Sequence, residues 1–304
     1  MIHYTHYQDI DYAKWDDCIR KSFNGNIYAY SWYLDIVCNT WDALIEDDYK
    51  TVMPLTGKKK YGINYLYQPV FTQQLGVFSV DKFSTEKVQE FLSAIPAKYK
   101  LIEINLNKFN SIDSGNFKTK NNLTHELDLI NSYMNLRIHY AVNTLRNITK
   151  GKKNNLTINY KANPTDIIQL FRKNRGKDIE QLKNKEYKIL KTLIEFCIVR
   201  GYGASWGAYT AKNELCAGAF FVQSHNKVIF LFSATNATAK KNGAMSFLID
   251  QFIQENAQRN LTFDFEGSND KNLARFYKSF GSKECVYLQI KKNSLPFPLK
   301  LLKK

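Results

Sequence analysis

The second half of the chain has the clearest pattern of apolar and polar positions. Residues 156–160 alternate as a strand does, and Asn163-Pro164 begins a stretch with apolar residues at helical spacing. A second helical stretch ends at Gly201. The pattern after Gly201 predicts three consecutive strands at 204–210, 215–222 and 228–233, followed by a helix at 247–253. It then predicts a short buried strand at 262–265, a helix at 273–280 and a final strand at 286–290. Antiparallel strands followed by a strand–helix–strand crossover predict an α/β fold with a mixed sheet.

The first half repeats this order of elements. Strands are predicted at 2–7, 43–46, 51–55, 65–68 and 101–106, and helices at 12–22, 32–39 and 88–95. A repeat of about half the chain predicts a duplicated domain. A helix over 133–150 joins the halves, so we expect an N-terminal domain at 1–150 and a C-terminal domain at 151–304, which carries the active site.

Composition adds a strong positive charge to this picture. Lys and Arg number 43 against 28 acidic residues in 304, which gives a net charge of +15. Such a surface attracts nucleic acid, anionic lipid or phosphorylated cofactors, although a chain rich in Lys and Asn throughout also reaches this charge as background. The basic runs 58–60 and 150–153 are each expected to be a solvated turn, and nothing resembles a nucleic-acid-binding motif.

The five cysteines are widely spaced and contain no Cys-x-x-Cys pair, so neither a disulfide framework nor a zinc site is expected. The N-terminus does not resemble a signal peptide, and no apolar run reaches the ~18 residues of a transmembrane segment. These features predict a cytoplasmic protein without a metal.

The first candidate site is the run Phe-Asp-Phe-Glu-Gly-Ser at 263–268. Strand alternation predicts Asp264 and Glu266 on one face and the two phenylalanines on the other. Carboxylates at the C-terminal end of a strand stand where open α/β sheets place ligands, and they can accept a proton from an amine. The alternative is that Glu266 caps the next helix or pairs with a cation.

The second candidate is the pair Tyr277-Lys278 on the following helix. A tyrosine hydroxyl can protonate a leaving thiolate, and an ammonium can stabilise an oxyanion. The alternative is a packed tyrosine and a solvated lysine.

The third candidate is the loop from Ser233 to Ser246, where a strand ends and a helix begins near Gly243. The N–H groups at a helix start bind anions, and Lys240 and Lys241 add charge, although an ordinary helix cap explains the same residues. The cofactor-binding residues expected here are Ser233, Ala234, Lys240, Lys241, Asn242, Gly243 and Ala244. No nucleophile elbow, Walker loop or Rossmann glycine triplet is present, and the five histidines are scattered.

Together these motifs resemble the GNAT acyltransferase superfamily. The resemblance covers the order of elements, the helix start at Gly243-Ala244, the strand 263–267 and the helix motif Ala274-x-Phe276-Tyr277-Lys278-x-Phe280-Gly281. The duplication and the joining helix with Arg146 resemble the tandem, FemABX-like branch.

The resemblance implies a donor and roles for several residues. In GNAT enzymes, acetyl-CoA enters between splayed strands and its pyrophosphate meets a Gln/Arg-x-x-Gly-x-Gly/Ala loop, here Lys240 to Met245, with Lys240 and Met245 departing from the motif. The general-acid tyrosine falls on Tyr277. FemABX-like enzymes instead take an aminoacyl group from tRNA and place it on a cell-wall precursor peptide. Their Phe-Lys pair falls on Tyr277-Lys278.

Three functions remain open at this stage. The favoured one is direct transfer from acetyl-CoA or another acyl-CoA to a small-molecule or peptide amine. The second is aminoacyl transfer from tRNA, which the net charge and the duplication favour. The third is an inactive binding protein that keeps the fold.

Overall fold

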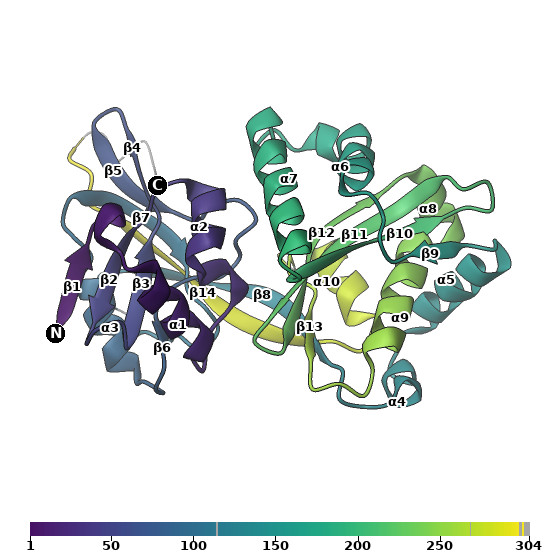
Figure 1. The fold of residues 1–304 in the computed structure, drawn as a ribbon, viewed down its shortest axis with the longest axis horizontal. Helices are drawn as coiled ribbons and strands as arrows, with labels where there is room; N and C mark the ends of the chain where they lie inside the picture. Colours follow the sequence, from purple (N-terminus) through teal and green to yellow (C-terminus); the bar gives the residue numbers. More distant parts are fainter. Residues whose placement is uncertain (114, 268, 298–299, 301–304) are drawn as a thin grey trace. The chain divides into compact units, whose positions relative to one another are not determined.

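The computed structural model describes residues 1–113, 115–267, 269–297 and 300 (Figure 1). The chain forms two compact units. Unit 1 combines Met1–Leu123 with Val286–Lys304, and unit 2 is the continuous segment Thr124–Cys285. This division differs from the predicted boundary near Gly151, because residues 124–150 pack in unit 2 and the C-terminal segment packs in unit 1.

Unit 2 is built on a mixed sheet. Its strands have the spatial order β8-β13-β12-β11-β10-β9, and all neighbours are antiparallel except the parallel pair β12–β13. The strands are β8 (Lys118–Asp128), β9 (Thr157–Asn159), β10 (Gly203–Tyr209), β11 (Leu215–Ser224), β12 (Lys227–Thr235) and β13 (Thr262–Asp264). The mixed sheet predicted from the order of elements is therefore confirmed.

Helices pack on the sheet of unit 2 as follows. Helix α6 lies against Gly218, where an added Cβ would come 2.6 Å from Ile167, so the glycine permits close packing. Helix α9 packs through Phe252, which stacks on Phe221 with ring centroids 3.9 Å apart. The helices are α4 (Tyr133–Arg137), α5 (Val142–Lys153), α6 (Pro164–Lys173), α7 (Asn184–Val199), α8 (Ala237–Asn242), α9 (Ala244–Asn256), α10 (Lys271–Lys278) and the 3-10 helix η3 (Arg175–Asp178).

Unit 1 contains two smaller sheets around its own apolar core. One has the order β1-β2-β3-β6 and the other includes β4-β5-β7-β14. Its strands are β1 (Ile2–Thr5), β2 (Asp42–Glu46), β3 (Thr51–Leu55), β4 (Gly57–Lys60), β5 (Ile63–Tyr67), β6 (Phe78–Ser79), β7 (Tyr99–Asn105) and β14 (Lys283–Asn293). Its helices are α1 (Tyr12–Lys21), α2 (Ser31–Cys38), α3 (Thr85–Ser93) and the 3-10 helices η1 (Tyr7–Asp9) and η2 (Ile27–Ala29).

The two halves of the chain exchange a strand. Strand β8, at the end of the first half, pairs with β13 in unit 2 through Asp264↔Glu126 and its neighbours. Strand β14, at the end of the second half, pairs with β7 in unit 1 from Gln289↔Asn105 to Asn293↔Leu101. Each unit is thus completed by a strand from the other half, which local sequence patterns do not reveal.

The predicted joining helix over 133–150 is wrong in one respect, because the structure breaks it into α4 and α5. At the break the N–H of Ala141 donates to the carbonyl of Ser279 (2.9 Å), and Thr144 Oγ1 donates to Ser279 Oγ (2.6 Å). These bonds anchor the bend to the end of α10. The basic runs predicted as turns are also elsewhere: 58–60 lies in β4 and 150–153 ends α5.

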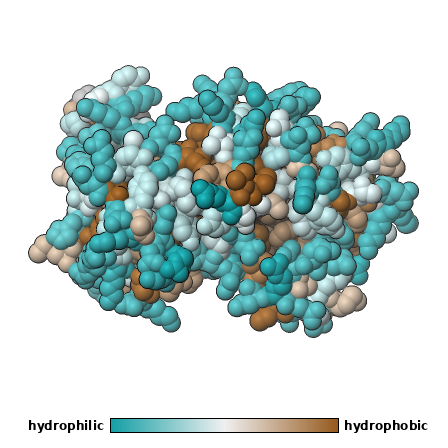
Figure 2. Space-filling view, viewed as in Figure 1, coloured by the Kyte–Doolittle hydropathy of each residue, from teal (hydrophilic) through white to brown (hydrophobic). Residues whose placement is uncertain are grey.

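The face of the molecule in Figure 2 is mostly hydrophilic, as the charged composition requires. Among the residues that the structure describes, no helix has both the length and the apolar character needed to cross a membrane.

Candidate functional site

The parallel strands β12 and β13 pair over a short stretch and then separate. Three pairs join them, from Lys227↔Thr262 to Ile229↔Asp264. Strand β12 continues to Thr235 beside β11, whereas β13 ends at Asp264. The chain leaves both strands at the same end of the sheet, toward α8 and α10, which places the loops after them where α/β sheets bind ligands.

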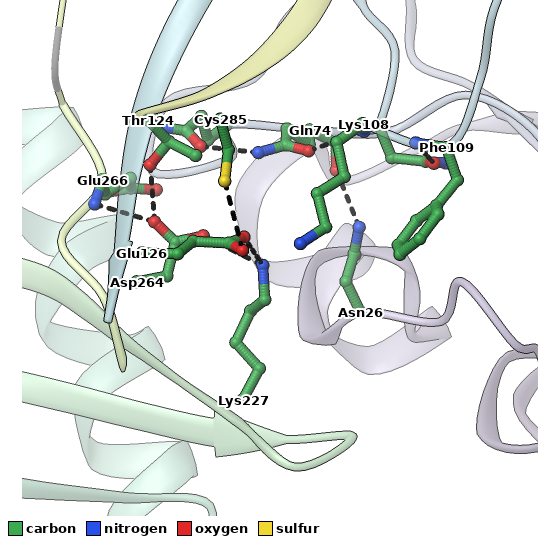
Figure 3. Close-up of polar contacts among 12 residues, drawn as sticks. Asn26, Gln74, Lys108, Phe109, Thr124, Glu126, Lys227, Asp264, Glu266 and Cys285 are labelled. Carbon is green, nitrogen blue, oxygen red and sulfur yellow. Dashed lines mark hydrogen bonds and ion pairs between the residues drawn. The ribbon is translucent and has the colours of Figure 1, made fainter. Parts of the chain in front are cut away.

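Asp264 lies in a buried polar cluster at the end of β13 (Figure 3). Its side chain is only 4% exposed. Oδ1 accepts hydrogen bonds from Thr124 Oγ1 (2.5 Å) and from the backbone N–H of Glu266 (3.0 Å), and Oδ2 lies 3.1 Å from Lys227 Nζ. Both carboxylate oxygens are therefore engaged within the protein, which suits an electrostatic or positioning role better than proton abstraction.

Lys227 links two carboxylates in this cluster. Its Nζ also lies 2.5 Å from Glu126 Oε1, and Cys285 Sγ donates to Glu126 Oε2 at 3.4 Å. Burial alone would lower the pKa of Lys227, but the charges of Asp264 and Glu126 outweigh it and raise the pKa. Lys227 is thus held as a cation between two anions. Lys227 and Glu126 were not among the predicted site residues, because their contact depends on the β8–β13 pairing, which no local pattern reveals.

Glu266 does not continue the strand, contrary to the alternation that predicted it beside Asp264 on one face. Its φ is +55°, in the left-handed region, and Gly267 follows with φ +56°. The chain therefore turns after Phe265, and period-two alternation ends there. Ser268, the last residue of this run, lies outside the described residues.

Tyr277 and Lys278 have opposite environments although they are adjacent on α10. Tyr277 is 5% exposed and stacks on Phe265 with ring centroids 5.0 Å apart. Burial, and then the charges of Glu266 and Asp270, raise the pKa of its hydroxyl. Lys278 is 67% exposed, and its Nζ lies 3.4 Å from Glu284 Oε1. Only the ammonium is thus presented to solvent.

His125 lies close to the same carboxylate. It is fully buried, its Nε2 is 3.9 Å from Glu284 Oε1, and neither ring nitrogen has a hydrogen-bond partner among the described residues. Burial lowers the pKa of this imidazole, so it is held neutral. Glu284 therefore stands between His125 and Lys278. A scattered histidine in the sequence carried no signal of this arrangement.

The third candidate region, from Ser233 to Ser246, is more tightly packed than expected of a phosphate-binding loop. Ser233 and Ala234 belong to β12, and Lys240 and Lys241 are exposed in α8. The predicted helix start at Gly243 is correct, since α9 begins at Ala244.

The protein itself occupies part of the start of α9. The N–H of Ala244 donates to Asn242 Oδ1 (3.1 Å), and an added Cβ at Gly243 would lie 2.2 Å from the carbonyl oxygen of Asn147 in α5. Both Gly243 and Ala244 are buried. Phosphate binding by these residues stays a prediction, and this packing weighs against it.

The described residues contain no group of three or more His, Cys, Asp or Glu side chains placed to hold a metal ion. What the site offers is a buried cation between two carboxylates, an exposed lysine on a carboxylate, and a shielded tyrosine. Such a set can orient a polar substrate and stabilise an oxyanion.

Comparison with known proteins finds similar folds among solved structures. No protein-family model matches the chain, and no curated protein matches it. Among solved structures, FemX is similar over 99% of both chains with a TM-score of 0.67 at 13% identity. A conserved protein of unknown function from Bacteroides thetaiotaomicron matches over 96% of this chain and 99% of its own (TM-score 0.62, 10% identity). The C-terminal domain of a protein described as a lysylphosphatidylglycerol synthetase from Agrobacterium fabrum matches over 96% and 93% (TM-score 0.57, 10% identity).

These similarities confirm the predicted fold. The chain has an α/β, tandem GNAT-like fold, and its likeness to the fold of FemX covers nearly its whole length. At this level of identity, the likeness concerns the fold and leaves the chemistry to the site.

Proposed function

We propose that the protein is an aminoacyltransferase that moves an aminoacyl group from a charged tRNA to an amine. The observation that carries this proposal is the partly occupied start of α9, where Asn242 accepts the N–H of Ala244 and the Asn147 carbonyl lies against Gly243. A GNAT enzyme needs N–H groups at this helix start for the pyrophosphate of CoA. The sequence favoured acyl-CoA as donor, whereas this packing supports the tRNA alternative.

The contrast between Tyr277 and Lys278 supports the same donor. A general acid is most effective when its pKa is near that of the leaving group, and a thiol has a pKa of about 8.5. The raised pKa of the buried Tyr277 hydroxyl moves it away from that value. An ester of tRNA instead develops an oxyanion, for which the exposed ammonium of Lys278 is suited.

The reaction is a direct aminolysis. The acceptor amine attacks the ester carbonyl, Lys278 stabilises the tetrahedral oxyanion, and the new amide bond forms as the ester bond to the ribose oxygen breaks. The proton lost by the amine passes to that oxygen. FemX and the lysylphosphatidylglycerol synthetase, by their names and folds, support transferase chemistry of this general kind.

The test compares two neighbouring substitutions. Lys278→Met keeps most of the side-chain stem and removes the charge, so we expect kcat for transfer from charged tRNA to a lysine-bearing cell-wall precursor peptide to fall by about 10²-fold or more. Tyr277→Phe should leave kcat close to wild type. Lys271→Met, an exposed lysine at the start of the same helix, is the matched control.

The competing donors give opposite results. Turnover with acetyl-CoA that depends on Tyr277 would overturn the proposal and restore the acyl-CoA enzyme. Absence of turnover with a panel of charged tRNAs and acyl-CoAs would favour an inactive binding protein.

Binding of tRNA should also depend on salt. A polyanion held by many cations loses affinity with a log–log slope of several units, because binding releases counterions. Filter binding between about 50 and 200 mM salt measures the slope. A flat response would mean that the +15 charge is background composition.

A further inference from the structure

Exposed apolar side chains gather on the segment that leads through α4 into α5 of unit 2. Ile130, Met134, Ile138 and Val142 are 57%, 63%, 73% and 73% exposed. They recur at every fourth position, and the N–H of Ile138 donates to the carbonyl of Met134 (3.2 Å), so these two lie one turn apart. Large apolar side chains exposed in a group, rather than singly, mark an interaction surface.

Other residues, on the opposite side of the segment, pack it against unit 2. Leu136, Tyr140 and Ile148 are buried in the core of unit 2, and Gly151 packs so closely on α9 that an added Cβ would lie 2.8 Å from Phe247. The packing of the segment against unit 2 therefore does not depend on the four exposed residues.

The same segment is purely cationic. From residue 129 to residue 155 the sequence contains five Lys and Arg and no Asp or Glu, in a chain that otherwise mixes both signs. Val142, Arg146, Lys150 and Lys153 follow at helical spacing along α5, and all are exposed. Val142, the last of the four apolar residues, thus lies on the same face of α5 as three cations.

We propose that residues 130–153 form a docking surface for an anionic lipid bilayer. Apolar side chains that enter the headgroup boundary, flanked by lysines that meet anionic headgroups, are the two features of interfacial membrane binding. A nucleic-acid surface would supply the charge but gives no place for four aliphatic side chains. The inference is independent of the proposed donor, and its test needs no catalytic activity.

The experiment is co-sedimentation of the full chain with vesicles. We expect binding to vesicles of phosphatidylcholine with about one quarter phosphatidylglycerol, weak binding to phosphatidylcholine alone, and weakening by salt. Met134→Ser with Ile138→Ser should lower the partition coefficient at least tenfold, and so should Lys150→Gln with Lys153→Gln.

Matched controls lie outside the surface. Val199→Ser removes an apolar side chain that is 82% exposed at the end of α7, and Lys173→Gln with Lys185→Gln removes two exposed cations. Both should bind vesicles as wild type does. Circular dichroism and thermal unfolding confirm that each variant is folded.

Three results would overturn the proposal. The first is no binding to anionic vesicles. The second is equal loss of binding in Lys173→Gln with Lys185→Gln and in Lys150→Gln with Lys153→Gln, which would mean that only net charge matters. The third is a wild-type dimer, seen by light scattering, that Met134→Ser with Ile138→Ser converts to a monomer, which would assign the surface to a second copy of the chain.

Discussion

Gly243 has a structural task that its sequence context did not reveal. Its φ is +74°, and its Cα faces the backbone of Asn147. We expect Gly243→Ala to lower the free energy of unfolding by about 2–5 kcal/mol, because a left-handed conformation and close packing both oppose a Cβ. Urea denaturation measures this loss.

A second glycine separates the two contributions. Gly201 has the same φ of +74° but no atom within 4 Å of an added Cβ. Gly201→Ala should therefore cost only the conformational part, roughly 1–2 kcal/mol. Equal losses at both positions would mean that α5 does not crowd the start of α9.

At the same scale, the sequence identified some residues of the site and missed others. Asp264 was found because a carboxylate at a strand end is a local pattern. Lys227 and Glu126 are 101 positions apart, and only the register of β8, β13 and β12 brings them together. The turn at Glu266 was missed because the left-handed region is rare for a glutamate, and Gly267 alone did not fix where the strand ends.

The contact between α9 and α4 contains a buried carboxylate that should make stability depend on pH. Asp250 on α9 is fully buried, and its Oδ1 accepts a hydrogen bond from Tyr133 (2.8 Å). Burial raises its pKa, although that hydrogen bond opposes the shift. The folded state then keeps a proton that the unfolded state loses above the usual pKa of about 3.9. This contribution to stability is present below the unfolded pKa and is lost as pH rises through the folded one.

Asp250→Asn should remove this dependence. The free energy of unfolding of the wild type should therefore fall relative to that of the variant as pH rises above about 4. Urea titrations at several pH values between 4.5 and 7.5 measure it. Tyr133→Phe removes the opposing hydrogen bond and should steepen the dependence, whereas parallel curves for wild type and Asp250→Asn would contradict the shift.

The helices and strands with a strongly periodic pattern of apolar residues were the ones that the sequence predicted well. Helices α6, α7 and α9 and strands β10, β11 and β12 combine clear patterns with helix caps or turns, and each was predicted as an element of the right type, the strands near their observed bounds. Strand β8 begins Lys-Thr-Lys-Asn-Asn and shows no alternation there, so its pairing, rather than its own sequence, makes it a strand. The break between α4 and α5 follows from bonds to Ser279, far along the chain.

For the whole molecule, the exchanged strands predict which fragments can fold. Residues 124–285 form a continuous unit with its own core, so this fragment should unfold cooperatively when expressed alone. The fragment 1–150, which the sequence suggested as a domain, lacks β14, which pairs with the edge of β7 opposite β5, and should not. Far-UV circular dichroism during thermal unfolding distinguishes the two.

A complementation control sharpens this prediction. A separate peptide of residues 283–297 supplies β14, so it should restore a cooperative transition to the fragment 1–123. A fragment 1–150 that unfolds cooperatively without the peptide would show that β14 is dispensable to unit 1.

The exchange of β14 also sets an order of events during synthesis of the chain. The ribosome releases residues 1–123 first, with β5 and β7 among them, yet β14, the second partner of β7, emerges about 170 residues later, on the order of ten to thirty seconds at usual elongation rates. Unit 2 is complete before then and can fold while its N-terminal neighbour waits. Until the last strand arrives, the nascent chain carries an unpaired β7 edge, the kind of surface to which chaperones and other nascent chains bind.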